Sequence, residues 1–355
     1  MRSFTRMTLA AIASAGVITG LTACADTGSE DSADTTGTTS AASDDTLVIY
    51  SGRDENLIAP LIERFEEATG IRTEVRYGST AEQAQLLITE GSNSPAEVFL
   101  SQEAGALGLV AQEGMLVELP EEVLEKVPAA FSSDDGQWVG LTGRARVVAY
   151  DEETVTEEEA PDTLAEMVDP KWAGEIAIAP GNASFLSFVT AIRVTEGEEA
   201  ARDFLQKLKD NDVQTYEKNG DILEAVNTGE VEIGLINHYY WYQSAAEVGA
   251  DNMRAQLKYG QPGDLAALIN ATGAGVLKQD TQDPQAIEFI EYLLSEEGQA
   301  YFAEETFEYP LLKGAEGPEG VPAFDAGANP DFDLSDMSSV DDTAALIDEV
   351  GLNIT

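Results

Sequence analysis

The segment LVIYSGRDENLIAPLIERF (47–65) decides the fold, because a short buried strand in it leads directly into an amphipathic helix. Residues 47–50 form an apolar run with β-branched members, which is typical of a buried strand. Pro60 is tolerated only near the first turn of a helix, so we expect the helix to begin close to Glu55. The apolar residues of this helix recur at the spacing of one face: Leu57, Ile58, Leu61, Ile62 and Phe65.

The same alternation of strand and helix continues along the chain. Residues 72–77 alternate in the manner of a half-buried strand. Ser79 and Glu82 have the spacing of a capping box and predict the start of a second helix. Residues 98–100 form a third short apolar strand. A strand–helix–strand–helix–strand series at these spacings predicts a parallel sheet.

Two loops of this series are candidates for a ligand site. Ligands of parallel sheets bind beyond the carboxyl ends of the strands. Residues 51–54 and 101–103 each follow a predicted strand, so we expect both loops to lie at that edge. The second half of the chain repeats the α/β pattern, with strands at 175–179 and 231–236 and helices at 185–194, 200–208, 221–227 and 239–248.

Two further apolar runs, 147–150 and 265–271, have the length of strands that cross between lobes. We therefore predict an α/β fold of two lobes with a ligand cleft between them, joined by crossing strands. The expected first lobe comprises residues 46–145 plus about 268–320. The expected second lobe comprises residues 146–267 plus about 321–355.

The first 24 residues have the features of a lipoprotein signal peptide. Arg2 and Arg6 form a basic start, and residues 7–20 are apolar or small throughout. This run is shorter than the roughly 20 residues that span a bilayer. Leu-Thr-Ala-Cys at 21–24 then matches a lipobox, and Cys24 is the only cysteine, so we predict lipidation of Cys24 and no disulfide within the chain.

Residues 25–45 consist almost entirely of Ala, Asp, Thr, Ser, Gly and Glu. Such a composition buries too little apolar surface to offset the entropy of ordering, so we predict a disordered tether. A lipid followed by a tether would hold the folded body at the extracytoplasmic face of the cell membrane.

The chain is strongly acidic, with a formal net charge of −47. Removing residues 1–24, which contain two arginines and no acidic residue, gives −49. Binding to nucleic acid or to an anionic membrane surface is excluded, because attraction to phosphate needs positive charge. The acidic residues are spread along the whole chain, which is typical of a solvated surface and identifies no metal site by itself.

An aromatic cluster, NHYYWY (237–242), directly follows a predicted strand. At the start of a helix, Tyr239 and Tyr240 are about 100° apart and can face the same cleft. The helix N-terminus favours phenolate over phenol, and a trivalent cation can deprotonate the phenols that coordinate it. Because ferric iron prefers anionic oxygen, the pair indicates ferric iron binding. Packing between lobes is the alternative interpretation of such a cluster.

Seven stretches are informative in their order and spacing: VIYSGRDENLI (48–58), SPAEVFLSQEAGAL (94–107), LTGRARVVAYD (141–151), PDTLAEMVDPKWAGEI (161–176), INHYYW (236–241), ATGAGVLK (271–278) and EYPL (308–311). Through them the chain closely resembles ferric-ion-binding proteins of ABC importers over residues 46–315. This resemblance implies the type II periplasmic-binding-protein fold and iron coordination by Tyr239 and Tyr240.

Other ligand positions of the family are altered in this chain. Many members have a histidine where this chain has Asp54, which is either a hard ligand or an ordinary helix N-cap. Many have a glutamate where this chain has Gln102, with Glu103 one residue later, so either residue is a candidate ligand. A third tyrosine, used in one branch, falls at Ser184.

The family completes its iron shell with a small anion, carbonate or phosphate. Arginine binds such anions bidentately, so Arg53, Arg144 and Arg146 are candidates, and we favour Arg53. A buried structural ion pair is the alternative for the other two. Further candidates are backbone and side-chain groups near a helix start or at a family position: Asn182, Ser184 and Asn219.

Catalysis by a Ser-His-Asp or Cys-His arrangement is close to excluded, because the chain has one histidine and one cysteine. We expect His238 to be structural or solvent-facing rather than a ligand.

We therefore predict that the protein is not an enzyme. We expect a monomeric solute-binding lipoprotein that delivers iron to an ABC permease and its ATPase. The rivals are the same fold binding a polyamine or sugar phosphate, a secreted carboxylate-based enzyme, and a surface adhesin.

Overall fold

The computed structural model describes residues 46–279, 284–329 and 332–352. Cys24, the signal segment and the tether lie outside these residues. The strands are β1 (Thr46–Ser51), β2 (Arg72–Tyr77), β3 (Val98–Ser101), β4 (Val139–Asp151), β5 (Ile176–Ile178), β6 (Gln214–Thr215), β7 (Ile233–Asn237), β8 (Ala255–Tyr259), β9 (Ile269–Val276) and β10 (Tyr309–Pro310).

The α-helices are α1 (Glu55–Thr69), α2 (Thr80–Glu90), α3 (Ala104–Gln112), α4 (Glu121–Leu124), α5 (Leu164–Met167), α6 (Ala183–Glu196), α7 (Glu198–Asp210), α8 (Asn219–Thr228), α9 (His238–Val248), α10 (Pro284–Leu293), α11 (Glu296–Glu305) and α12 (Val340–Val350). The 3₁₀ turns are η1 (Gly91–Asn93), η2 (Ala129–Phe131), η3 (Pro170–Trp172), η4 (Ala250–Asn252), η5 (Leu265–Ala267) and η6 (Leu334–Ser338). No helix among the described residues is long and apolar enough to cross a membrane.

The predicted βαβ series is confirmed. Strand β1 pairs in parallel with both β2 and β3, so that Ile49 lies opposite Val75 on one side and Val98 on the other. Helix α1 begins at Glu55 as expected, and it buries Phe65 with the other apolar residues of its face. The capping box at Ser79 is also present, with Glu82 accepting from the Ser79 backbone N–H at 3.0 Å.

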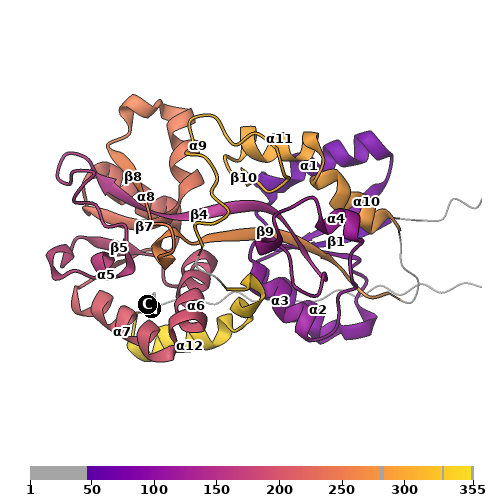
Figure 1. The fold of residues 1–355 in the computed structure, drawn as a ribbon, viewed down its shortest axis with the longest axis horizontal. Helices are drawn as coiled ribbons and strands as arrows, with labels where there is room; N and C mark the ends of the chain where they lie inside the picture. The colour runs from indigo at the N-terminus through magenta and orange to yellow at the C-terminus, as the bar shows by residue number, and fades with distance from the viewer. Residues whose placement is uncertain (1–45, 280–283, 330–331, 353–355) are drawn as a thin grey trace, which may run out of the picture. The chain divides into compact units, whose positions relative to one another are not determined.

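A second parallel group consists of β7, β5 and β6, and the two groups are joined through β9 and β4. In Figure 1, α1 and α10 lie on one side of β1 and β9, and α2 and α3 lie on the other. Near the second group, α8 and α9 lie above the strands in this view, and α6, α7 and α12 lie below. The observed architecture is therefore the mixed α/β fold that the sequence predicts.

Strand β4 is the long central connection. All of its 13 residues are buried: other strands pair with its edges, and α8, α9 and α11 contact it. Its first part, up to Ala145, pairs with β9 and β10, and its second part, from Arg146, pairs with β7 and β8. The partners change where we expected the first lobe to end.

The C-terminal segment contacts helices of both halves. Turn η6 packs on α3, and α12 packs on α6 and α7. A Cβ atom on Gly105 or Gly108 would overlap backbone oxygen atoms of η6, so only glycine permits this approach. We expected residues from about 321 onward to belong to the second lobe, whereas the structure shares this tail between the two groups of helices.

The end of β4 is stabilised by an ion pair, and its loss should show in the pH dependence of stability. Asp151 accepts a bidentate contact from Arg254, which holds the pKa of the Asp151 carboxyl below its usual range. This stabilisation is present at neutral pH and is lost as pH falls below about 4. We expect Asp151→Asn to lower the melting temperature at pH 7, and the difference from wild type to shrink on acidification.

Glu153→Gln is the matched control, because Glu153 contacts the same Arg254 at 3.0 Å but its side chain is 66 % exposed. Exposed pairs contribute roughly 0–1 kcal/mol, so this variant should remain close to wild type. Thermal unfolding of the three proteins between pH 3 and 7 provides the measurement. An Asp151→Asn difference that does not change over this range would contradict the assignment.

Candidate metal site

Tyr239 and Tyr240 lie at the start of α9, directly after β7. Their rings stack with centroids 4.4 Å apart, Tyr239 being buried and Tyr240 half-buried. The sequence prediction that this segment begins a helix is confirmed, with the first helical residue one position earlier, at His238. The two phenol groups therefore lie side by side at a helix N-terminus, where negative charge is favoured.

The surroundings of Tyr239 favour the protonated phenol. Burial, followed by the neighbouring Tyr240, raises the pKa of the Tyr239 phenol well above its ordinary value, while Arg144 opposes this shift. Burial lowers the pKa of Arg146, and both tyrosines act in the opposite direction and raise it. Two buried guanidinium groups, those of Arg144 and Arg146, therefore lie within electrostatic reach of the tyrosine pair.

His238, the only histidine, is buried and fully engaged. Its Nδ1 accepts from the Ala145 backbone N–H at 3.2 Å, and its Nε2 donates to the Phe307 carbonyl oxygen at 2.9 Å. Burial lowers the pKa of His238 to about 4. A neutral ring with both nitrogen atoms in use is a structural histidine, and neither nitrogen is free to bind a metal.

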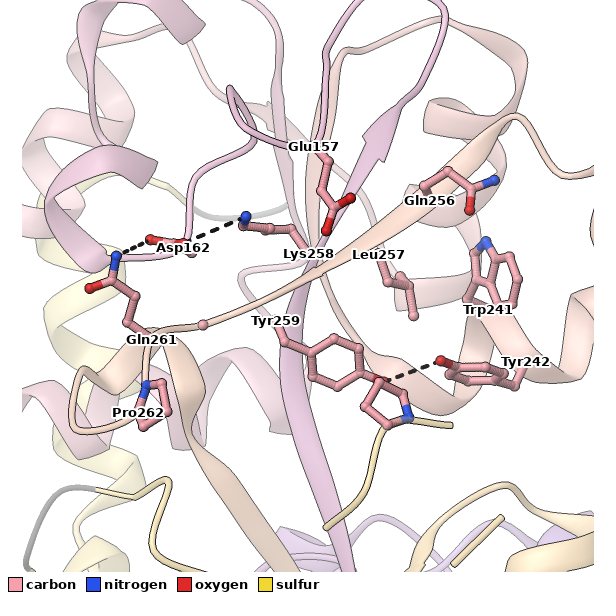
Figure 2. A pocket seen from close by; sticks show the side chains of 12 residues that line it. Glu157, Asp162, Trp241, Tyr242, Gln256, Leu257, Lys258, Tyr259, Gln261 and Pro262 are labelled. Carbon is pink, nitrogen blue, oxygen red and sulfur yellow. Dashed lines mark hydrogen bonds and ion pairs between the residues drawn. The ribbon is translucent and has the colours of Figure 1, made fainter. Parts of the chain in front are cut away.

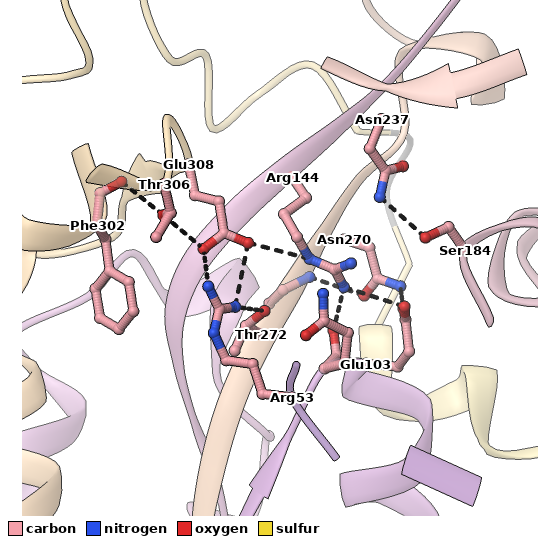
Figure 3. Close-up of polar contacts among 12 residues, drawn as sticks. Arg53, Glu103, Arg144, Ser184, Asn237, Asn270, Thr272, Phe302, Thr306 and Glu308 are labelled. Carbon is pink, nitrogen blue, oxygen red and sulfur yellow. Dashed lines mark hydrogen bonds and ion pairs between the residues drawn. The ribbon is translucent and has the colours of Figure 1, made fainter. Parts of the chain in front are cut away.

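Arg53 forms a buried ion pair (Figure 3). Both terminal nitrogens contact Glu308, and Nη1 also donates to the Thr272 hydroxyl at 2.9 Å. The positive charge of Arg53 accordingly holds the pKa of Glu308 below its usual range against the effect of burial. An anion at Arg53, the position we favoured, would have to compete with Glu308 for these donors.

Glu103 and Arg144 form a second buried pair beside the first (Figure 3). Glu103 Oε1 lies 3.1 Å from Arg144 Nη2, and Arg144 also donates to the Gln102 carbonyl oxygen. The other carboxylate oxygen, Oε2, accepts from the Ser187 hydroxyl at 2.9 Å and from the Asn270 amide. Burial raises the pKa of Glu103, and Arg144 opposes this shift.

Arg146 connects this cluster to the other predicted anion-binding residues. It donates to the Leu235 carbonyl at 2.9 Å and to Asn219 Oδ1 at 3.5 Å, and burial lowers its pKa to about 9. Asn219 in turn donates to Asn182 Oδ1 at 3.4 Å. Asn182 caps α6 by accepting from the Ser184 backbone N–H at 3.0 Å. The structure therefore brings these residues together.

A small polar cavity of about 10 Å³ lies at the centre of this cluster. This volume is about that of a single water molecule. Among the described residues, Nε of Arg144 and Nε of Arg146 have no hydrogen-bond partner. The cavity is lined by Glu103, Arg144, Arg146, Ser184, Asn237, Leu268 and Asn270.

The remaining predicted ligands lie at helix and strand ends. Asp54 is exposed and caps α1, accepting from the Asn56 backbone N–H at 2.9 Å, so its N-cap role is present. Gln102 is half-buried, and its Oε1 is buried without a partner among the described residues. Metal coordination by Asp54, Gln102 or Glu103 remains a prediction. No group of three His, Cys, Asp or Glu side chains in the described part forms a metal site.

A larger pocket is lined by the last two residues of the aromatic cluster (Figure 2). Its volume is about 450 Å³, and Trp241, Tyr242 and Tyr259 are among its lining residues. The Tyr242 and Tyr259 hydroxyl groups are 3.5 Å apart across it. The aromatic cluster is thus divided, with its last two residues facing this pocket and its tyrosine pair interacting with the buried arginines.

Sequence reasoning missed several members of the polar cluster. Asn270 is a single polar residue within an apolar run predicted to cross between lobes, and this contrast was an available signal. Glu308 stands at the start of the EYPL stretch, which we used only for the resemblance. Ser187 and Asn237 carried no signal of their own, since a serine in a helix and an asparagine after a strand are common.

A two-lobed α/β protein with a polar site between parallel-strand groups has the architecture of an extracytoplasmic solute-binding protein. The family model described as bacterial extracellular solute-binding protein matches residues 93–332. The chain belongs to this family.

Several proteins that this chain resembles are named for ferric iron. It is 31 % identical over 318 residues to the Fe(3+)-binding periplasmic protein of Serratia marcescens, covering 89 % of this chain and 93 % of that protein. It is 35 % identical over 270 residues to the major ferric iron-binding protein of Neisseria meningitidis, covering 75 % and 80 %. The crystal structure of iron-bound HitA from Pseudomonas aeruginosa matches with a TM-score of 0.80 at 32 % identity, covering 86 % of this chain and 99 % of that one.

Proposed function

We propose that this chain captures ferric iron outside the cytoplasm and delivers it to an ABC permease driven by an ATPase. The observation that carries the proposal is the stacked pair Tyr239–Tyr240 at the N-terminus of α9, within electrostatic reach of the buried Arg144 and Arg146. Similarity to proteins named for ferric iron binding supports the same ligand.

The proposed chemistry follows from the hardness of the cation. Ferric iron prefers anionic oxygen, and its charge lowers the pKa of the phenols that coordinate it. Tyr239 and Tyr240 would supply two phenolates, with Asp54, Gln102 and Glu103 as secondary candidate ligands. An anionic oxygen group held by the arginines, for which carbonate or phosphate is the family expectation, would complete the shell.

The same proposal covers the location of the protein. A lipid on Cys24 and the tether of residues 25–45 would keep a monomeric binding protein beside the permease. Such a protein binds and releases its ligand without turning it over, and its cleft would close on the metal by a hinge movement.

A rival function within the same fold is binding of an organic solute. The 450 Å³ pocket lined by Trp241 and Tyr242 favours it, because a polyamine or the sugar of a sugar phosphate could stack on those rings.

Titration of the purified protein with ferric citrate tests the proposal against this rival. Iron–phenolate bonds absorb visible light, so we expect an orange-red colour that saturates at one iron per chain. Spermidine and a hexose phosphate, followed by tryptophan fluorescence because Trp241 lines the pocket, are expected to give no saturable change. If the protein stayed colourless and bound either organic solute, that solute would replace iron as the proposed ligand.

A further inference from the structure

Glu103 lies among donors of the kind that bind small anions. Its side chain is buried, and the chain surrounds it with a guanidinium, a hydroxyl and an amide, from Arg144, Ser187 and Asn270. These are the donors that proteins use to bind small oxyanions. Arg146 and Ser184, two of the predicted anion-binding residues, line the same cavity as Glu103.

The two carboxylate oxygens of Glu103 have different surroundings. Oε2 accepts hydrogen bonds from Ser187 and Asn270 and is thereby fixed to the protein. Oε1 forms a buried ion pair with Arg144, 3.1 Å from its Nη2, and has no further polar contact among the described residues. One oxygen is therefore anchored and the other retains lone pairs for a cation, as in an anion that bridges a metal and its protein.

The space that remains is too small for a second anion. The cavity of about 10 Å³ holds roughly one water molecule, whereas carbonate has four heavy atoms and phosphate has five. A dianion placed there would also lie against the Glu103 carboxylate, and like charges at such a distance repel strongly. Nε of Arg144 and Nε of Arg146 have no hydrogen-bond partner among the described residues, and Arg144 Nε lies 4.0 Å from Glu308 Oε1, so the Arg144 guanidinium is already balanced by carboxylates of the chain.

We propose that the Glu103 carboxylate is a tethered substitute for the small anion, so that this chain binds ferric iron without added carbonate or phosphate. The proposal rests on the proposed iron function. Glu103 is then the residue that makes a free anion unnecessary. Its Oε2 holds the carboxylate in place, and its Oε1 supplies the negative oxygen that a free anion would otherwise supply.

The test compares iron binding with and without added anion in two variants. Protein in carbonate- and phosphate-free buffer is loaded with ferrous chloride that is oxidised in situ by CO₂-free oxygen, and the phenolate band is titrated. Wild type should give the full band without added anion, and millimolar bicarbonate or phosphate should leave it unchanged. Glu103→Ala should lose affinity on the order of 10- to 100-fold, and bicarbonate or formate should restore it by entering the vacated space.

Glu103→Gln should lose affinity similarly without being restored, because the amide removes the charge but fills the same space. Glu113→Gln, at the exposed C-terminal end of α3, makes the same charge change away from the site and should behave as wild type. Circular dichroism establishes that each variant is folded.

Three results would overturn the proposal. They are a wild-type band that requires added anion, variants at Glu103 that bind as tightly as wild type, and a loss in Glu103→Ala that no anion restores. A wild-type protein that shows no band under any condition would instead remove the iron function itself.

Discussion

Replacing both Tyr239 and Tyr240 with phenylalanine should abolish the iron–phenolate band and lower ferric affinity by more than roughly 100-fold, beyond the effect of losing groups that only support metal ligands. Phenylalanine cannot supply an anionic oxygen, so the hard cation loses both principal ligands. The stacked rings, 4.4 Å apart, keep their apolar contacts, so the melting temperature should change little. Visible absorption during ferric titration and thermal unfolding measure the two effects separately.

Tyr242→Phe provides the matched control for this double variant. Tyr242 belongs to the same helix but lines the aromatic pocket with Trp241. Its substitution should leave the band and the affinity unchanged. A visible band that persists in the double variant, or that disappears in Tyr242→Phe, would show that iron lies elsewhere in the molecule.

Replacing Glu308 with alanine should lower the free energy of unfolding by about 3–5 kcal/mol, the usual effect of removing one partner from a buried ion pair. The side chains of Arg53 and Glu308 are both fully buried. Without Glu308, the Arg53 guanidinium keeps the Thr272 hydroxyl but no longer has a carboxylate to balance its charge. Equilibrium unfolding in guanidinium chloride at pH 7 measures the change.

Glu291→Ala is the control for charge removal at the surface. Glu291 lies 3.9 Å from Lys126, and its side chain is 42 % exposed, so its loss should change stability by less than about 1 kcal/mol. Equal effects of the two substitutions would mean that burial of the Arg53 pair contributes nothing specific to stability.

The parts of the fold that the sequence predicts are those set by neighbouring residues. Helix α1 and the capping box of α2 follow from spacing within a few positions, and both are where they were expected. Strand β4 was only partly predicted, as residues 147–150, because Gly140, Gly143, Arg144 and Arg146 interrupt the apolar pattern before that run. Its first part pairs with β9 and β10, and the strand contacts helices from distant parts of the chain, which no local pattern contains.

In the candidate site, too, the sequence predicts what neighbouring residues determine and misses what distant residues determine. The tyrosine pair is adjacent in the chain, so the sequence alone predicts it. The Glu103 cluster joins residues far apart, with Asn270 lying 167 positions from Glu103, and Arg53 is 255 positions from Glu308. Residue type marked Arg53 and Arg144 as candidates, and the family resemblance marked Glu103, but only the folded chain determines which carboxylate each arginine contacts.

The C-terminal tail restricts how far α3 can separate from α6 and α7. Turn η6 is seated on glycines of α3, and α12 is attached to α6 and α7, with Thr343 and Thr190 hydroxyls 2.7 Å apart. A short segment of fixed contour length therefore links two groups of helices that a hinge movement would separate. Because η6 also contacts α6, a movement that separated α3 from α6 would require η6 or α12 to detach from one of its partners.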